Sequence, residues 1–134
     1  MTRKINSVLL TDDDPDDRFL FEEALLSADP DITYQSAVDG LDAIDKLKKG
    51  SLPDVIFLDV NMPRMNGIAC LQELRQIPLL SEIAVIMYST SSYYRDECFK
   101  LGADAYIEKP SDFAKLCEKL KVITQGGLPL KDVS

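Results

Sequence analysis

The chain has 134 residues, 46% of them hydrophobic and 28% charged, a balance typical of one globular domain with its own core. Fifteen Lys and Arg against 23 Asp and Glu leave a net charge of −8, which argues against nucleic acid or an anionic membrane surface as a partner, because both need a basic face. The sequence holds no His, so histidine-based catalysis is excluded.

The first predicted strand covers residues 5–10, where Val8-Leu9-Leu10 forms a short apolar run. The acidic stretch 12–17 follows, and Pro15 within it suits the first turn of a helix whose N-terminus acidic side chains complement. Asp29-Pro30-Asp31 is expected to end that helix.

A second strand is predicted over residues 32–37 from a weak polar and apolar alternation. Asp39-Gly40 then opens a second helix, which Gly50 ends. The third strand lies in the stretch 53–63, where four apolar residues run directly into Asp59 and a turn containing Pro63 follows. Such a short, fully apolar run with turn signals on both sides favours a strand buried on both faces.

The remaining segments repeat the alternation of strand and helix. They are a helix from Asn66-Gly67 to before Pro78, a strand over 83–88 ending at Ser89, a helix over 93–101, a strand over 103–107 before Lys109, and a helix from Ser111 to Gly126-Gly127. Five β-α units in a row predict an α/β fold, a doubly wound parallel sheet with helices on both faces.

Polar side chains follow four of these strands. In such a sheet the strands end at one edge, so the topology brings Asp12, Asp13, Asp59, Ser89 and Lys109 together. The rest of the acidic run, Asp16 and Asp17, is better explained as a solvated helix start. Taken singly, Ser89 is more typical of a loop or helix cap and Lys109 of the surface, so the combination carries the interpretation.

Clustered carboxylates repel one another, and a hard divalent cation such as Mg²⁺ relieves the repulsion. With the cation bound, an ionised Asp59 can attack an electrophilic phosphorus, while Lys109 and Ser89 contact the other phosphoryl oxygens. The sequence therefore predicts a phosphate-accepting aspartate that needs no general base.

The motifs that carry this chemistry resemble those of the CheY-like receiver domains of two-component response regulators. They are Val8 to Asp13, Asp54 to Pro63 with Asn66-Gly67, Val85 to Thr90, and Gly102 to Pro110. The resemblance covers residues 7–123 and implies the flavodoxin-like strand order 2-1-3-4-5. We expect a receiver domain over residues 1–125 and a short, fraying tail over 126–134 without an output domain.

The resemblance also implies a role for each site residue. Asp59 would be the phosphoacceptor and, with Asp13, the backbone carbonyl of Asn61 and, through water, Asp12, would bind Mg²⁺ (or Mn²⁺). Ser89 and Tyr106 would form the switch, with Tyr106 turning inward as Ser89 moves, and Lys109 would pair with the phosphoryl group. Asn61 and Ser91 would tune its lifetime. A cis Lys109–Pro110 bond is implied too, and Thr11, where the family has an apolar residue, is expected to affect packing only.

The implied partners are a sensor histidine kinase or histidine phosphotransfer protein upstream and a protein target downstream. The target would contact the fourth helix, fifth strand and fifth helix, and a homodimer is also compatible with this interpretation. The protein would be a regulatory phosphoacceptor that catalyses only its own phosphorylation and dephosphorylation.

Three widely spaced Cys and no apolar run near membrane-spanning length fit a cytoplasmic location. The Asp-Pro-Asp-Asp and Ser-Thr-Ser segments are similar to stand-alone regulators of the phytochrome-partner type.

Four other interpretations share some of these features. A haloacid-dehalogenase-type phosphatase has a second acid two residues after its nucleophile, where this chain has Asn61. A flavodoxin-like FMN site is disfavoured because Asp12 to Asp14 would repel a phosphate, and a calcium loop lacks the alternating ligands. A receiver fold that acts as a binding module without phosphorylation stays open, and Tyr93-Tyr94 would then be a candidate partner patch.

Overall fold

The computed structural model describes residues 2–130 and places five parallel strands in one sheet, in the order β2-β1-β3-β4-β5. The strands are β1 (Ser7–Thr11), β2 (Thr33–Ala37), β3 (Val55–Leu58), β4 (Ala84–Ser89) and β5 (Ala105–Glu108). The helices are α1 (Pro15–Ala28), α2 (Gly40–Lys49), α3 (Gly67–Gln76), α4 (Arg95–Lys100) and α5 (Phe113–Gly126). The predicted fold and strand order are confirmed.

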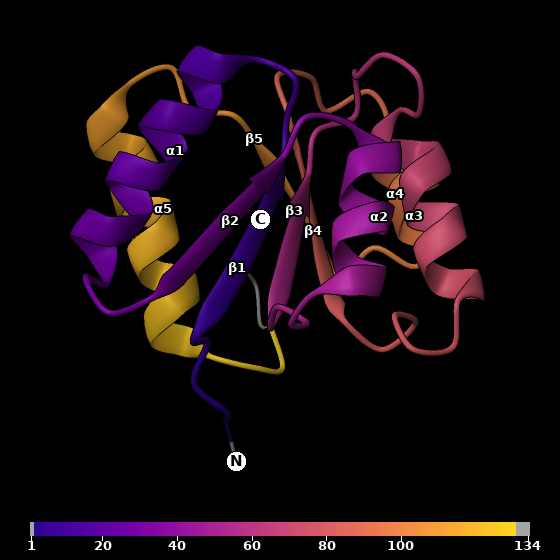
Figure 1. The fold of residues 1–134 in the computed structure, drawn as a ribbon. Coiled ribbons are helices and arrows are strands. Elements are labelled where there is room, and N and C mark those ends of the chain that lie inside the picture. Colours follow the sequence, from indigo (N-terminus) through magenta and orange to yellow (C-terminus); the bar gives the residue numbers. More distant parts are fainter. Residues whose placement is uncertain (1, 131–134) are drawn as a thin grey trace.

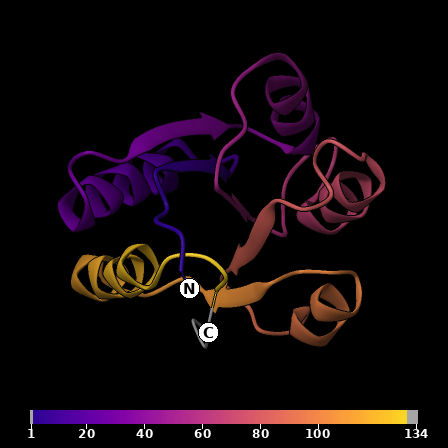
Figure 2. The same ribbon diagram turned by 90° about the horizontal axis from the view of Figure 1, so that it is seen from below.

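Helices cover both faces of the sheet. Helices α1 and α5 lie together on one face, and α2, α3 and α4 lie on the other (Figures 1 and 2). Alternate strand residues feed two cores, so Leu10 and Phe57 pack toward α1 and α5, whereas Leu9 and Ile56 pack toward α2 and α3. All four residues of β3 are buried, as expected for a central parallel strand covered on both faces.

Polar side chains cap four of the helices that follow the carboxyl ends of the strands. Asp14, Asp39, Asn66 and Asp112 accept hydrogen bonds from backbone N–H groups in the first turns of α1, α2, α3 and α5. These caps satisfy donors that a helix start leaves unpaired. They also fix where each strand-to-helix loop ends, so the loops that carry the site residues are short and defined.

The predicted start of the fifth strand at residue 103 is two residues too early. The turn that ends α4 continues through Gly102, whose φ of 103° is in the region that favours glycine. The Ala103 N–H then donates to Cys98 and the Asp104 N–H to Val85. The apolar Ala103 therefore belongs to the helix-ending turn, and β5 begins at Ala105.

The expectation of a fraying tail is wrong for residues 127–130. Arg3 and Leu128 form an antiparallel bridge with two N–H···O bonds of 2.7 Å, and Leu128 is buried in the core between the sheet and α5. The tail residues 131–134 lie outside the described structure. No helix within residues 2–130 is long and apolar enough to cross a bilayer.

The expected cis bond is also wrong. The Lys109–Pro110 peptide is trans, the isomer that the intrinsic preference of X–Pro bonds favours, and the one cis bond in residues 2–130 is Leu128–Pro129.

Candidate functional site

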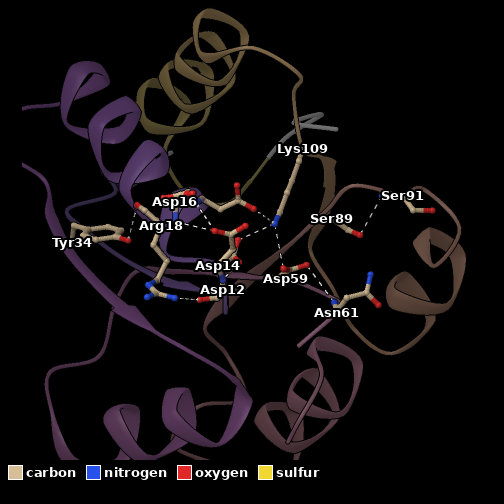
Figure 3. A network of polar contacts seen from close by, with 11 residues as sticks. Asp12, Asp14, Asp16, Arg18, Tyr34, Asp59, Asn61, Ser89, Ser91 and Lys109 are labelled. Carbon is tan, nitrogen blue, oxygen red and sulfur yellow. Dashed lines mark hydrogen bonds and ion pairs between the residues drawn. The ribbon is translucent and has the colours of Figure 1, made fainter. Parts of the chain in front are cut away.

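The sheet extends its hydrogen-bond ladder by one residue into the site. The N–H of Asp12 donates to Ala37 at 3.0 Å, that of Asp59 to Thr11 at 2.9 Å, and that of Lys109 to Ser89 at 2.7 Å. Each functional residue is thus held by the neighbouring strand at the point where its own strand ends. Their side chains converge at this edge, as Figure 3 shows.

Lys109 is the central cation of the site. Its Nζ lies 2.9 Å from Asp12 Oδ2, 3.2 Å from Asp59 Oδ2 and 3.0 Å from Asp17 Oδ2, and its side chain is only 11% exposed. Burial opposes the charge, but the hydrogen bond and charge of Asp12, together with Asp59 and Asp17, raise the pKa of Lys109 above its ordinary value. The predicted meeting of Asp12, Asp59 and Lys109 is what the structure contains.

Asp17 has a role that sequence reasoning missed. It was expected to be a solvated helix-start residue, yet its carboxylate binds Lys109 from the first turn of α1. The local sequence around Asp17 does not predict this contact, because its partner Lys109 follows β5, far along the chain.

Asp59 has an unusual protonation equilibrium for an aspartate. Its residue is 7% exposed, and this burial raises its pKa to about 6, with the Asp12 charge adding to the increase and Lys109 opposing it. A buried carboxylate that costs free energy to ionise gains from any additional cation placed beside it.

This shift predicts a pH-dependent effect of Asp59→Asn on stability in metal-free buffer. The folded state holds the Asp59 proton more tightly than the unfolded state, so wild-type stability from this group is greatest in acid and is lost as the pH rises from about 4 through 6. We expect the variant to be more stable than wild type by about 3 kcal/mol at pH 7, and by much less at pH 4. Urea unfolding at both pH values measures the difference, and a difference that does not change with pH would contradict the assignment.

Three carboxylates form a candidate cation site. One oxygen from each of Asp12, Asp13 and Asp59 lies within 4.8 Å of the other two. Asp13 is exposed, whereas Asp12 is fully buried. The Oδ1 atom of Asp12 accepts a hydrogen bond from the Asp14 N–H at 3.0 Å. An all-oxygen donor set that is partly open to water suits Mg²⁺, which prefers carboxylates and keeps several waters.

Asn61 belongs to the segment that leads from Asp59 to α3. Its N–H donates to Asp59 Oδ1 at 3.3 Å, and further along the segment Gly67 N–H donates to the Val60 carbonyl at 2.9 Å. The segment therefore folds back tightly over the end of β3. The contact supports a place for Asn61 at the site through its backbone.

The predicted switch residues lie on neighbouring strands: Ser89 ends β4, and Tyr106 lies in β5 opposite Met87. Ser89 is fully buried, and its Oγ accepts a hydrogen bond from the Ser91 N–H at 3.3 Å. Tyr106 is 1% exposed, and its hydroxyl donates to the Ser91 carbonyl. Tyr106 is therefore already inward in this structure, so an inward turn that follows Ser89 stays a prediction.

Two further features lie beside the site, and sequence reasoning missed the first of them. Asp39 on the α2 cap binds Arg64 in the segment after β3 at 2.6 Å. Thr11 is fully buried, and its Oγ1 has no hydrogen-bond partner within residues 2–130. A cap aspartate followed by a glycine was visible at residues 39–40, but nothing in the sequence pairs it with Arg64.

Comparisons with known proteins agree with this geometry. Residues 8–121 match the response regulator receiver domain family. The transcriptional regulatory protein DegU of Brevibacillus brevis is 33% identical over 116 residues, which cover 84% of this chain and 49% of DegU. The chain thus spans about half the length of that relative.

Two solved structures are similar over nearly their whole length. The phosphorylated cyanobacterial phytochrome response regulator RcpA superposes with a TM-score of 0.83 at 28% identity, covering 93% of this chain and 95% of RcpA. The Thermotoga maritima response regulator TrrA, in complex with Mg²⁺-BeF, gives a TM-score of 0.73 at 29% identity, covering 87% of this chain and 97% of TrrA.

Proposed function

Because the chain belongs to the response regulator receiver domain family of two-component systems, we propose that Asp59 is its phosphoacceptor and that Mg²⁺ is required for the transfer. The phosphoryl group would come from a phosphohistidine on a sensor kinase or phosphotransfer protein. The product is a regulatory aspartyl phosphate that changes a protein-binding surface or passes the group onward. By this proposal the chain catalyses only its own phosphorylation and dephosphorylation.

The observation that carries the proposal is the set of contacts around Lys109. One buried ammonium bridges Asp12 and Asp59, from the ends of two neighbouring strands. Repulsion between buried carboxylates is costly unless a cation compensates it. The site is therefore built to hold cationic groups around Asp59, which is what a transferring phosphoryl group needs.

The chain's own residues would act as follows. An Asp59 carboxylate oxygen forms a bond to phosphorus while the donor's P–N bond breaks, and the freed imidazole takes a proton from solvent. Lys109 moves from the carboxylates to a phosphoryl oxygen, and the Ser89 hydroxyl donates to another. Mg²⁺, held by Asp13, Asp59, the Asn61 carbonyl and, through water, Asp12, would neutralise charge on the phosphoryl oxygens.

The test is the intact mass of the protein after incubation with acetyl phosphate. We expect one phosphoryl adduct in Mg²⁺ and none in excess EDTA or in Asp59→Asn. An adduct on Asp59→Asn of the same occupancy would refute the assignment of Asp59. No adduct on the folded wild type, with Mg²⁺ and with a phosphohistidine donor, would favour the binding module instead.

The donor protein would dock over the exposed apolar start of α1 and α5. Phe19 is 61% exposed and Leu20 45%, and both lie on the helix that supplies Asp17 to the site. Phe113, 45% exposed, borders with Leu20 a small hollow that Lys109 also lines. Exposed apolar side chains beside a buried polar site are typical of a surface that a partner covers.

Replacing Phe19 with serine is therefore expected to slow transfer from a phosphohistidine protein by on the order of tenfold, because the donor loses an apolar contact. Labelling by acetyl phosphate should not change, since that donor needs no docking surface. Val122→Ser is a matched control, because Val122 is 60% exposed on α5. Equal slowing with both donors would show that the substitution damages the site and not the surface.

The output surface would be α4, β5 and α5. Tyr93, two residues before α4, is 83% exposed. Arg95, Lys115 and Lys119 border a hollow of about 440 Å³ that Tyr106 and Lys109 also line. A hollow that Lys109 lines can respond to a change at Asp59. NMR shift changes on adding Mg²⁺ and beryllofluoride should concentrate on these elements, and shifts confined to α2 and α3 would contradict this placement.

A further inference from the structure

The segment between β3 and α3 determines how well Asn61 is placed at the site. Two hydrogen bonds fix this segment on the side that faces β3. The Asn61 N–H donates to Asp59 Oδ1, and the Gly67 N–H donates to the Val60 carbonyl. A backbone carbonyl has no side-chain freedom, so its position as a ligand depends on the path of this segment. Whatever holds the far side of the segment therefore affects the cation site.

The far side is held by the start of α2. The Arg64 Nε lies 2.6 Å from Asp39 Oδ2, and the Gly40 N–H donates to the Met65 carbonyl at 3.1 Å. A Cβ on Gly40 would lie 2.8 Å from that carbonyl oxygen, so the two loops approach as closely as their backbones permit. Arg64 has a φ of 61°, a backbone conformation that costs a non-glycine residue about 1 kcal/mol and needs support from its surroundings.

Asp39 supplies that support from a buried position. Its side chain is 3% exposed, and its Oδ1 also accepts the Asp42 N–H at 2.9 Å as the cap of α2. Burial disfavours the charge, but the hydrogen bond and charge of Arg64, with the backbone donors, hold the pKa of Asp39 below its usual range. The carboxylate is thus a fixed anchor, with one oxygen for the helix and one for Arg64.

We infer that Asp39 and Arg64 are positioning residues of the cation site, and that their ion pair fixes the segment that carries Asn61 and so strengthens Mg²⁺ binding. They act through the backbone of that segment and not as ligands. The inference rests on the proposed function, because it assumes that Mg²⁺ binds beside Asp59. By this inference the loop between β2 and α2, which supplies no ligand, helps to position the cation site.

The test separates the ion pair from the helix cap. Asparagine caps helices about as well as aspartate, so Asp39→Asn keeps the cap and removes the charge, whereas Arg64→Gln removes the other partner. We expect each variant to bind Mg²⁺ about tenfold more weakly by calorimetric titration, the lower end of the effect of removing groups that orient metal ligands. The double variant should be no weaker than either single one. Without metal, NMR should show that the Asn61 and Met65 amides exchange faster in both single variants than in the wild type.

Asp54→Asn is the matched control. Asp54 also accepts backbone N–H bonds and pairs with an exposed arginine, Arg3, at 2.7 Å, but it lies at the opposite end of the sheet. This control should lose stability without a change in Mg²⁺ affinity. Unchanged affinity, within twofold, in both Asp39→Asn and Arg64→Gln would overturn the inference. Failure of the folded wild type to bind Mg²⁺ would instead overturn the proposed function.

Discussion

Replacing Lys109 with methionine should slow phosphoryl transfer to Asp59 roughly 100-fold, the effect of removing one preorganised group that stabilises transition-state charge. The Lys109 ammonium lies 3.2 Å from Asp59 Oδ2, on the carboxylate that would receive the phosphoryl group. Methionine has a side chain of similar length and apolar character but lacks the ammonium, and so also loses the contact of Nζ with the Tyr88 ring, whose centroid lies 5.2 Å away. The initial rate of labelling by acetyl phosphate in saturating Mg²⁺ measures the effect.

The same variant should bind Mg²⁺ more tightly than wild type, because Lys109 and the metal ion compete for the carboxylates of Asp12 and Asp59. Slower transfer combined with tighter metal binding is a signature that misfolding cannot produce. Lys121→Met, on the exposed side of α5, should change neither quantity. Weaker Mg²⁺ binding in Lys109→Met would show that the lysine organises the site and does not compete with the cation.

Replacing Gly67 with alanine is expected to lower the free energy of unfolding by about 3 kcal/mol, the upper end for overpacking a close contact. A Cβ at this position would lie 2.2 Å from the Asp59 carbonyl oxygen and 2.9 Å from Val60 Cα. Both atoms belong to the backbone at the end of β3, so no side chain can move aside. The start of α3 must shift away from the end of β3, which displaces the segment that carries Asn61 relative to Asp59.

Urea unfolding gives the stability change, and Mg²⁺ titration should show weaker binding in the same variant. Gly126→Ala is the control, since a Cβ there would meet no atom within 4 Å and alanine favours helix over glycine by up to about 1 kcal/mol. That variant should be unchanged or slightly more stable. If Gly67→Ala proved as stable as Gly126→Ala, the tight approach of α3 to Asp59 would be refuted.

The central part of the site could be predicted because it depends on features that the sequence displays. The four apolar residues before Asp59 require a strand buried on both faces, and β3 is that strand. Once the alternation of strand and helix defines a parallel sheet, the strand ends must meet at one edge. This rule alone predicts that four side chains meet, and the structure brings them together: Asp12, Asp59, Ser89 and Lys109.

The contacts that were missed depend on side chains reaching between loops. Asp17 and Lys109 are far apart in the chain, and Asp17 reads as an ordinary helix-start acid until the rotamer of Lys109 is known. Asp39 satisfies its local role as a cap, which hides its second bond to Arg64. Leu128 follows Gly126-Gly127, a strong helix-stop signal, and its burial against the core depends on pairing with Arg3 at the other end of the chain.

The most direct test of the site is a structure of the protein with Mg²⁺ and beryllofluoride, a mimic of an aspartyl phosphate. The assignment predicts beryllium on an Asp59 carboxylate oxygen, with Lys109 and Ser89 on its fluorides. It also predicts Mg²⁺ bound by Asp13, Asp59 and the Asn61 carbonyl, with Asp12 reaching it through water. Beryllofluoride on another carboxylate, or a cation held away from Asp59, would contradict the central claim that the strand ends assemble a phosphoacceptor.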